Sequence, residues 1–145
     1  MKTSIVEFHC SQCGTKFRAA AVSDFAYGIM LCRTPGGEVR YVDCFEDPVF
    51  GEIERMIDAL RIEPLDDGRA AAAQREAFGL SCDPSVNGER FHAGVAPLCP
   101  QCGTARGERG QEPVDFVNLD AVTHDRWGAL SDAQRRELVR EVLRF

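Results

Sequence analysis

Two apolar segments, residues 25–33 and 38–45, flank the tetrapeptide Thr-Pro-Gly-Gly. Their apolar and aromatic content predicts two strands joined as a β-hairpin. Proline and glycine at the central turn positions favour a type II turn that is closed by Thr34 and Gly37. In that register both faces of the hairpin carry apolar side chains, so we expect both faces to be covered. The same register places Cys32 and Cys44 on opposite faces, where we expect buried thiols and no disulfide between them.

The next segment has the periodicity of an amphipathic helix. Asp47 is suited to the N-cap and Pro48 to the first turn, and the apolar stripe that follows runs toward Pro64, where the helix must stop. The alanine-rich segment after this proline predicts a second helix over residues 68–78, ended by Gly79.

The C-terminal part of the chain combines a strand with helices. Residues 114–119 predict a strand, Thr123 is a candidate cap for a short helix, and Ser131 begins a capping-box pattern before a last amphipathic helix. Residues 81–96 are interpreted as a loop or short hairpin, and residues 107–113 as a turn-rich connector. The expected fold class is α+β, with a small β-hairpin or sheet and three to four helices in a single domain, residues 1–145.

A five-residue pattern, Cys-x-x-Cys-Gly, occurs twice, and we call residues 10–17 the first hook and residues 99–106 the second hook. Two thiolates in one tight turn can bind a single metal ion, and four arranged tetrahedrally suit zinc or iron. The pattern therefore predicts one metal site, Zn²⁺ with Fe as the alternative, made by four cysteines: Cys10, Cys13, Cys99 and Cys102.

The distance between the hooks along the chain does not argue against a shared site. Closing a flexible loop of this length costs about 4 kcal/mol plus a constant. Structural zinc contributes roughly 10–16 kcal/mol in zinc-finger peptides. We therefore interpret the hooks as two halves of one zinc clasp that holds the N- and C-terminal halves together. Residues 18–98 are then an inserted hairpin with helices, and residues 120–145 are a C-terminal helical segment.

The two hooks resemble the paired cysteine knuckles of zinc-ribbon and rubredoxin-like proteins. The first hook has an aromatic residue four positions after its second cysteine, and the second hook has a proline after its first cysteine. The resemblance covers about a tenth of the chain and implies coordination by four sulfur atoms. It does not extend to electron transfer, because a long helical insertion replaces the short aromatic-rich core expected between rubredoxin knuckles.

Composition narrows the class of protein further. The chain contains seven cysteines and no N-terminal apolar segment typical of a secretory signal. We therefore expect a cytoplasmic protein that binds metal, since disulfide frameworks belong to oxidising compartments. No apolar run is long enough to span a membrane.

The negative charge is concentrated in one segment. Residues 43–67 carry a net charge of −7 within a chain whose total is −6. This can be a solvated helix face, or a surface for a basic partner. We expect a non-catalytic, zinc-stabilised protein-binding module, either an inhibitor or immunity-type protein or an adaptor, whose partner-binding residues are five acids: Asp47, Glu52, Glu54, Asp58 and Glu63.

Two alternative functions remain open at the level of the sequence. One is a zinc-ribbon regulator that binds nucleic acid through the arginines of the last helix. The acidic residues interleaved with these arginines and the negative net charge of the chain argue against phosphate binding. Cys82 and His92 lie in one loop beside the second hook and are the candidates for a nucleophile and base of an enzyme.

Overall fold

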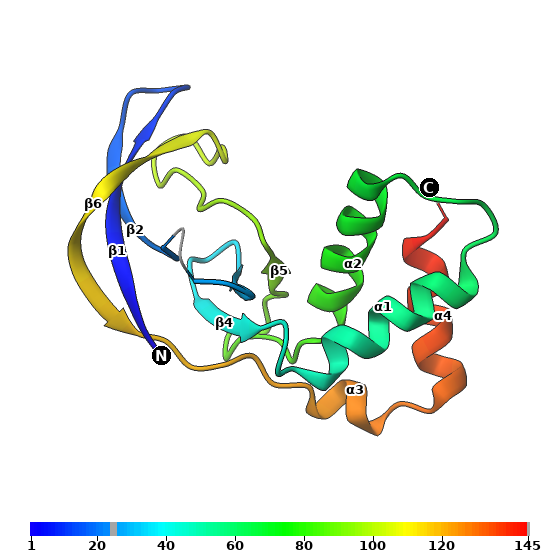
Figure 1. The fold of residues 1–145 in the computed structure, drawn as a ribbon. Helices are drawn as coiled ribbons and strands as arrows, with labels where there is room; N and C mark the ends of the chain where they lie inside the picture. The colour runs from blue at the N-terminus through cyan, green and yellow to red at the C-terminus, as the bar shows by residue number, and fades with distance from the viewer. Residues whose placement is uncertain (24–25, 145) are drawn as a thin grey trace.

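The computed structural model describes residues 1–23 and 26–144, and within them it confirms the α+β class. The described strands form two sheets of three strands each, and Figure 1 shows the sheet of β1, β2 and β6 at one end of the molecule, the helices at the other, and the second sheet between them. The elements in chain order are β1 (Lys2–Cys10), β2 (Lys16–Ala21), β3 (Ile29–Arg33), β4 (Val39–Asp43), α1 (Pro48–Leu60), α2 (Asp67–Ser81), β5 (His92–Ala93), β6 (Gly107–Asn118), α3 (Asp125–Ala129) and α4 (Asp132–Val142).

The first sheet joins two N-terminal strands to a strand from the last third of the chain. Its order is β2-β1-β6, and both pairings are antiparallel. The prediction of a connector over residues 107–113 was wrong, because these residues form the first half of β6. Gly107 lies opposite Cys10, and a Cβ at Gly107 would stand 3.1 Å from Phe8 and 3.2 Å from Phe17. This glycine therefore serves close strand packing over the stacked Phe8 and Phe17 rings.

The hairpin of β3 and β4 forms in a register one residue away from the prediction. Arg33 pairs with Val39, and the turn is closed by a hydrogen bond from the Thr34 amide to the Glu38 carbonyl. The positive φ, 94°, belongs to Gly37, while Gly36 has none, so the predicted type II turn was wrong. A three-residue loop with glycine in the left-handed position is the geometry the chain adopts.

The corrected register changes which side chains share a face. Cys32 and Val42 pack with Cys44 against the helical core, whereas Leu31 packs with Val39 in a separate cluster toward the first sheet. The expectation of a hairpin covered on both faces is therefore confirmed, but the placement of Cys32 and Cys44 on opposite faces was wrong. All seven cysteines are free thiols in the structure. Phe25, part of the predicted first strand, lies outside the described residues.

Two of the three N-cap residues predicted from the sequence cap their helices in the structure. Asp47 caps α1, and Ser131 forms a complete capping box at the start of α4. Thr123 does not cap α3; its hydroxyl donates to Asp83, whose carboxylate accepts the backbone amides of Asp125 and Arg126. A carboxylate distant in sequence thus replaces the local cap. Phe145, at the end of the predicted last helix, lies outside the described residues.

Helix α2 continues through the glycine that was expected to end it. Gly79 lies inside the helix, and a Cβ at this position would stand 2.7 Å from the Phe91 carbonyl oxygen. The glycine permits close approach of the segment that leads into β5, and the helix ends at Ser81 instead.

The apolar interior is divided between the two ends of the molecule. The main cluster includes Ile53, Phe78 and Val139 and joins α1, α2 and α4 to one face of the hairpin. A small cluster of Val6, Phe8 and Ala21 lies within the first sheet. No helix in the described part of the chain has the length and apolar character needed to cross a membrane.

Candidate metal centre

The two hooks adopt the same local conformation. In the first, the Gly14 amide donates to the Cys10 carbonyl (2.8 Å); in the second, the Gly103 amide donates to the Cys99 carbonyl (2.9 Å). The φ angles of the two glycines are 79° and 74°, values that L-residues with a side chain rarely adopt. The glycine after each Cys-x-x-Cys therefore closes the turn that directs both thiols to one side.

The sheet brings the two hooks together. The first hook is the turn between β1 and β2, and the second hook leads into β6, which pairs with β1. The amide and hydroxyl of Ser11 both donate to the Arg106 carbonyl at 3.0 Å, and the Arg106 guanidinium donates to the Gln12 side chain. The hooks are thus joined by protein contacts as well as by any metal.

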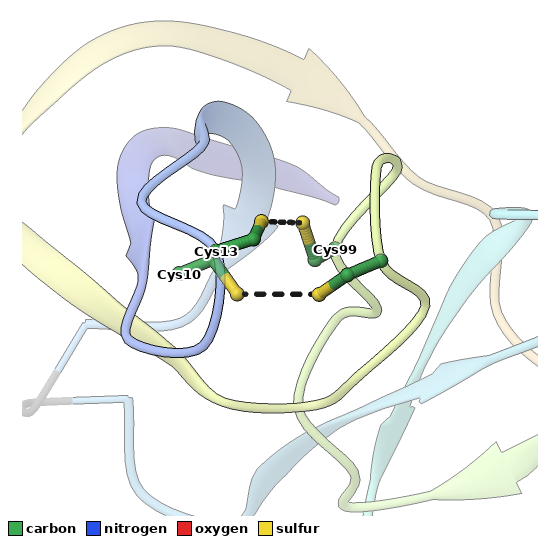
Figure 2. A group of neighbouring side chains, drawn as sticks. Cys10, Cys13 and Cys99 are labelled. Carbon is green, nitrogen blue, oxygen red and sulfur yellow. Dashed lines mark hydrogen bonds between the residues drawn. The ribbon is translucent and has the colours of Figure 1, made fainter.

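Four sulfur atoms converge between the hooks, as predicted. Those of Cys10, Cys13, Cys99 and Cys102 all lie within 4.8 Å of one another, and Figure 2 shows the three labelled thiols, Cys10, Cys13 and Cys99, pointing into the same space. The Cys10–Cys102 and Cys13–Cys99 sulfur pairs are each 3.6 Å apart. Sulfur atoms about 2.3 Å from a tetrahedral zinc ion would lie about 3.8 Å from each other. The cluster therefore fits a single metal ion.

The surroundings of Cys10 favour its thiolate, the form in which cysteine binds metals. The backbone amide of Cys13 is the main cause that lowers the pKa of the Cys10 thiol to about 6, in spite of burial, with a further contribution from the Thr104 hydroxyl. The Thr104 hydroxyl lies 3.2 Å from the Cys102 sulfur, and the Thr15 hydroxyl lies 3.1 Å from the Cys13 sulfur. Each hook therefore supplies a threonine beside its second cysteine.

The candidate nucleophile and base do not share a pocket. Cys82 is buried, and its thiol donates to the Phe78 carbonyl at 3.3 Å. The pKa of the neighbouring Cys32 thiol is raised, mainly by its hydrogen bond with Cys82 and next by burial. His92 lines a cleft on the other side of β5, and Cys82 is not part of that lining.

A Ser-His-Asp arrangement that was not predicted from the sequence lies where the start of α1, the end of α2 and the start of α3 meet. Nε2 of His124 lies 2.8 Å from the Asp47 carboxylate, and Nδ1 lies 3.2 Å from the Ser81 hydroxyl. The Ser81 side chain is 1% exposed and its hydroxyl donates to the Phe78 carbonyl, so no substrate can reach it. The arrangement is a buried network that ties α1 to α2 and α3. Its members are 34 to 77 residues apart, and no local pattern indicates it.

The five acids proposed as a partner surface divide into two groups. Asp47 caps α1 and contacts His124, while Glu52 accepts hydrogen bonds from Arg135 and from the Trp127 indole. These two carboxylates are engaged within the molecule. The remaining three are exposed to solvent: Glu54, Asp58 and Glu63.

Apart from Arg135, three arginines of the C-terminal segment, residues 132–144, form ion pairs with acids of that segment. Arg136 pairs with Asp132 at 2.8 Å, and Arg140 and Arg144 both approach Glu137. This pairing is that of a solvated helix face.

The fold and the site define an α+β protein with a four-cysteine cluster that can hold a metal ion. Comparison with protein-family models, with curated proteins and with solved structures found no match.

Proposed function

We propose that this chain is a non-catalytic protein-binding module whose fold is stabilised by one zinc ion. The convergence of four thiols from two distant hooks is the observation that carries the metal part of the proposal. Four protein ligands complete a tetrahedral shell, so no coordination position is left for a substrate or an activated water. Such a site contributes to folding and not to catalysis.

Elemental analysis of protein prepared without chelator tests this part. We expect one zinc ion per chain, and a colourless protein, because iron bound by four thiolates absorbs visible light. Cys102→Ser should lose the metal and lower the melting temperature. Cys44→Ser is the matched control, since Cys44 lies outside the cluster, and it should keep the metal. A Cys102→Ser variant that has no metal and melts like the parent would refute a structural role.

The partner surface that we propose lies at the end of α1 and in the connector to α2. Glu54, Asp58 and Glu63 are exposed there, and Ile62 beside them is 99% exposed. Ile62 lies between Arg61 and Glu63, and an exposed apolar side chain with a charged rim can anchor a partner, since interface centres are apolar and their rims polar. The negative charge favours a basic partner, which would suit an inhibitor or immunity-type protein or an adaptor.

The partner is identified by capture from the native host with the metal-loaded protein, followed by mass spectrometry. The double variant Glu54→Lys/Asp58→Lys should then slow association at low salt, and the parent's association rate should fall as salt rises. Glu108→Lys/Glu112→Lys, on the exposed side of β6, makes the same charge change elsewhere and should have little effect.

Two results would reverse this assignment. Equal effects of the two double variants would show that net charge, and not the α1 surface, governs binding. Binding of nucleic acid that is abolished by reversing Arg136 and Arg140 to Glu would favour the nucleic-acid-binding regulator instead.

A further inference from the structure

A cleft with a volume of about 960 Å³ lies between the first sheet, the tip of the β3–β4 hairpin and the segment that leads into the second hook. Its walls are mainly apolar, with side chains such as Ile5, Val39, Leu98 and Leu119. No acidic residue of the described chain lines it, although acids outnumber Lys and Arg by 23 to 17 in the sequence. The cleft is therefore an apolar site whose lining contains arginine and no acid, in an acidic protein.

The charge in this cleft comes from a buried guanidinium. Arg33 is 8% exposed; its Nε donates to the Val95 carbonyl at 3.1 Å and its Nη2 to the Ala20 carbonyl at 2.6 Å. Both partners are neutral. In the described part of the chain, no carboxylate forms an ion pair with Arg33, and its Nη1 donates to no group.

A cation in this position is costly unless an anion accompanies it. Burial lowers the pKa of Arg33, which measures the loss of water around the charge, but a guanidinium stays protonated in proteins. The two carbonyls hold the guanidinium in place and leave the two N–H groups of Nη1 without a protein acceptor. The side chain is thus positioned to donate to an anionic group that enters the cleft.

We propose that the cleft binds a small apolar molecule carrying one carboxylate, whose charge pairs with Arg33 and whose hydrocarbon part lies against the apolar walls. The volume falls within the range of about 300–1,000 Å³ that is typical of small-molecule pockets. Besides the two arginines and the Cys99 thiol, Thr34 and His92 are the polar side chains of the lining. A peptide would bury many more backbone polar groups than these could satisfy, so an acyl or aryl chain fits the lining better. Exposed Arg18 at the rim adds a second positive charge for steering.

Fluorescence titration with dansylaminoundecanoic acid tests the proposal, with its methyl ester as the neutral counterpart. The metal-loaded parent should bind the acid at least about tenfold more tightly than the ester, because a hydrogen bond to a charged group is lost in the ester. The Arg33→Gln variant should bind the acid and the ester with equal affinity. Its melting curve should show that the variant is folded.

A second pair of variants does not depend on the stability of the Arg33 variant. Val95 is half-exposed in the cleft wall, so Val95→Glu places a carboxylate in the site and should abolish binding of the acid. Val86→Glu makes the same change at an exposed position outside the cleft and should bind like the parent. Equal affinity of the parent for acid and ester, or no binding of either, would overturn the proposal. Binding of peptides with apolar C-termini in the absence of small-acid binding would overturn it as well.

Discussion

The carboxylate of Asp47 has two separate tasks, and they can be removed one at a time. Oδ1 accepts the amides of Val49 (2.8 Å) and Phe50 (3.3 Å) at the start of α1. Oδ2 lies 2.8 Å from Nε2 of His124, and the two side chains are only 12% and 13% exposed. Because both tasks are carried out away from bulk water, solvent screening reduces their contributions little.

The magnitudes follow from the two contacts. Replacing an N-cap aspartate by alanine costs about 0.5–2 kcal/mol. Losing a hydrogen bond to a charged partner costs about 1.5–3 kcal/mol. Asp47→Ala removes both, so the free energy of unfolding should fall by about 2–5 kcal/mol. Asp47→Asn keeps an oxygen for the cap and can turn its amide toward Nε2, so it should lose only the charge-assisted part, about 1 kcal/mol.

Urea unfolding, followed by far-ultraviolet circular dichroism at equal metal content, measures these differences. Glu54→Ala is the control: it removes an exposed carboxylate from the same helix and should change stability by no more than about 0.5 kcal/mol. If Asp47→Ala and Asp47→Asn are equally destabilised, the cap contributes nothing. If both resemble Glu54→Ala, the reasoning about this network is refuted.

Two further predictions concern a buried glycine and a partly buried thiol. Gly79→Ala should destabilise the protein by about 1–3 kcal/mol, because its Cβ would stand 2.7 Å from the Phe91 carbonyl oxygen. Gly128 in α3 is the control: a Cβ there meets nothing within 4 Å, so Gly128→Ala should stabilise the protein by up to about 1 kcal/mol in the same urea assay. Burial raises the pKa of Cys44 to about 11 from its ordinary 9.0, so the unfolded chain loses this proton first and stability should fall as pH rises between these values. Over that pH range the melting temperature should fall less steeply with pH for Cys44→Ala than for the parent. An equal slope for the two proteins would contradict the assignment.

Local signals in the sequence predicted those features that depend on neighbouring residues. The hooks, the caps at Asp47 and Ser131, and the hairpin all have their determinants within a few positions of one another. The hairpin register was missed by one residue because two adjacent glycines allow the positive φ at either position, and the chain uses Gly37.

Features set by distant packing could not be read from local patterns. Gly79 resembles a helix stop in sequence but serves the close approach of Phe91 in space. The first half of β6 contains two glycines and a proline and was interpreted as a connector, yet pairing with β1 makes it a strand. The buried Arg33 was not singled out, because only the tertiary structure places it at a cleft without a counter-ion.

The distribution of apolar packing explains why a metal would be placed where the hooks are. The cluster that unites the helices contains fourteen buried residues, whereas the cluster within the first sheet contains three, Val6, Phe8 and Ala21. The first sheet thus has few buried side chains of its own to offset the conformational entropy of ordering its strands, and Ala20 and Leu119 add only a small cluster with Leu31 of the hairpin. The hooks lie at the end of this sheet where β1 turns into β2 and where β6 begins. A zinc ion bound there would contribute its free energy to the part of the fold whose own core is smallest, and through Cys99 it would also fix one wall of the cleft.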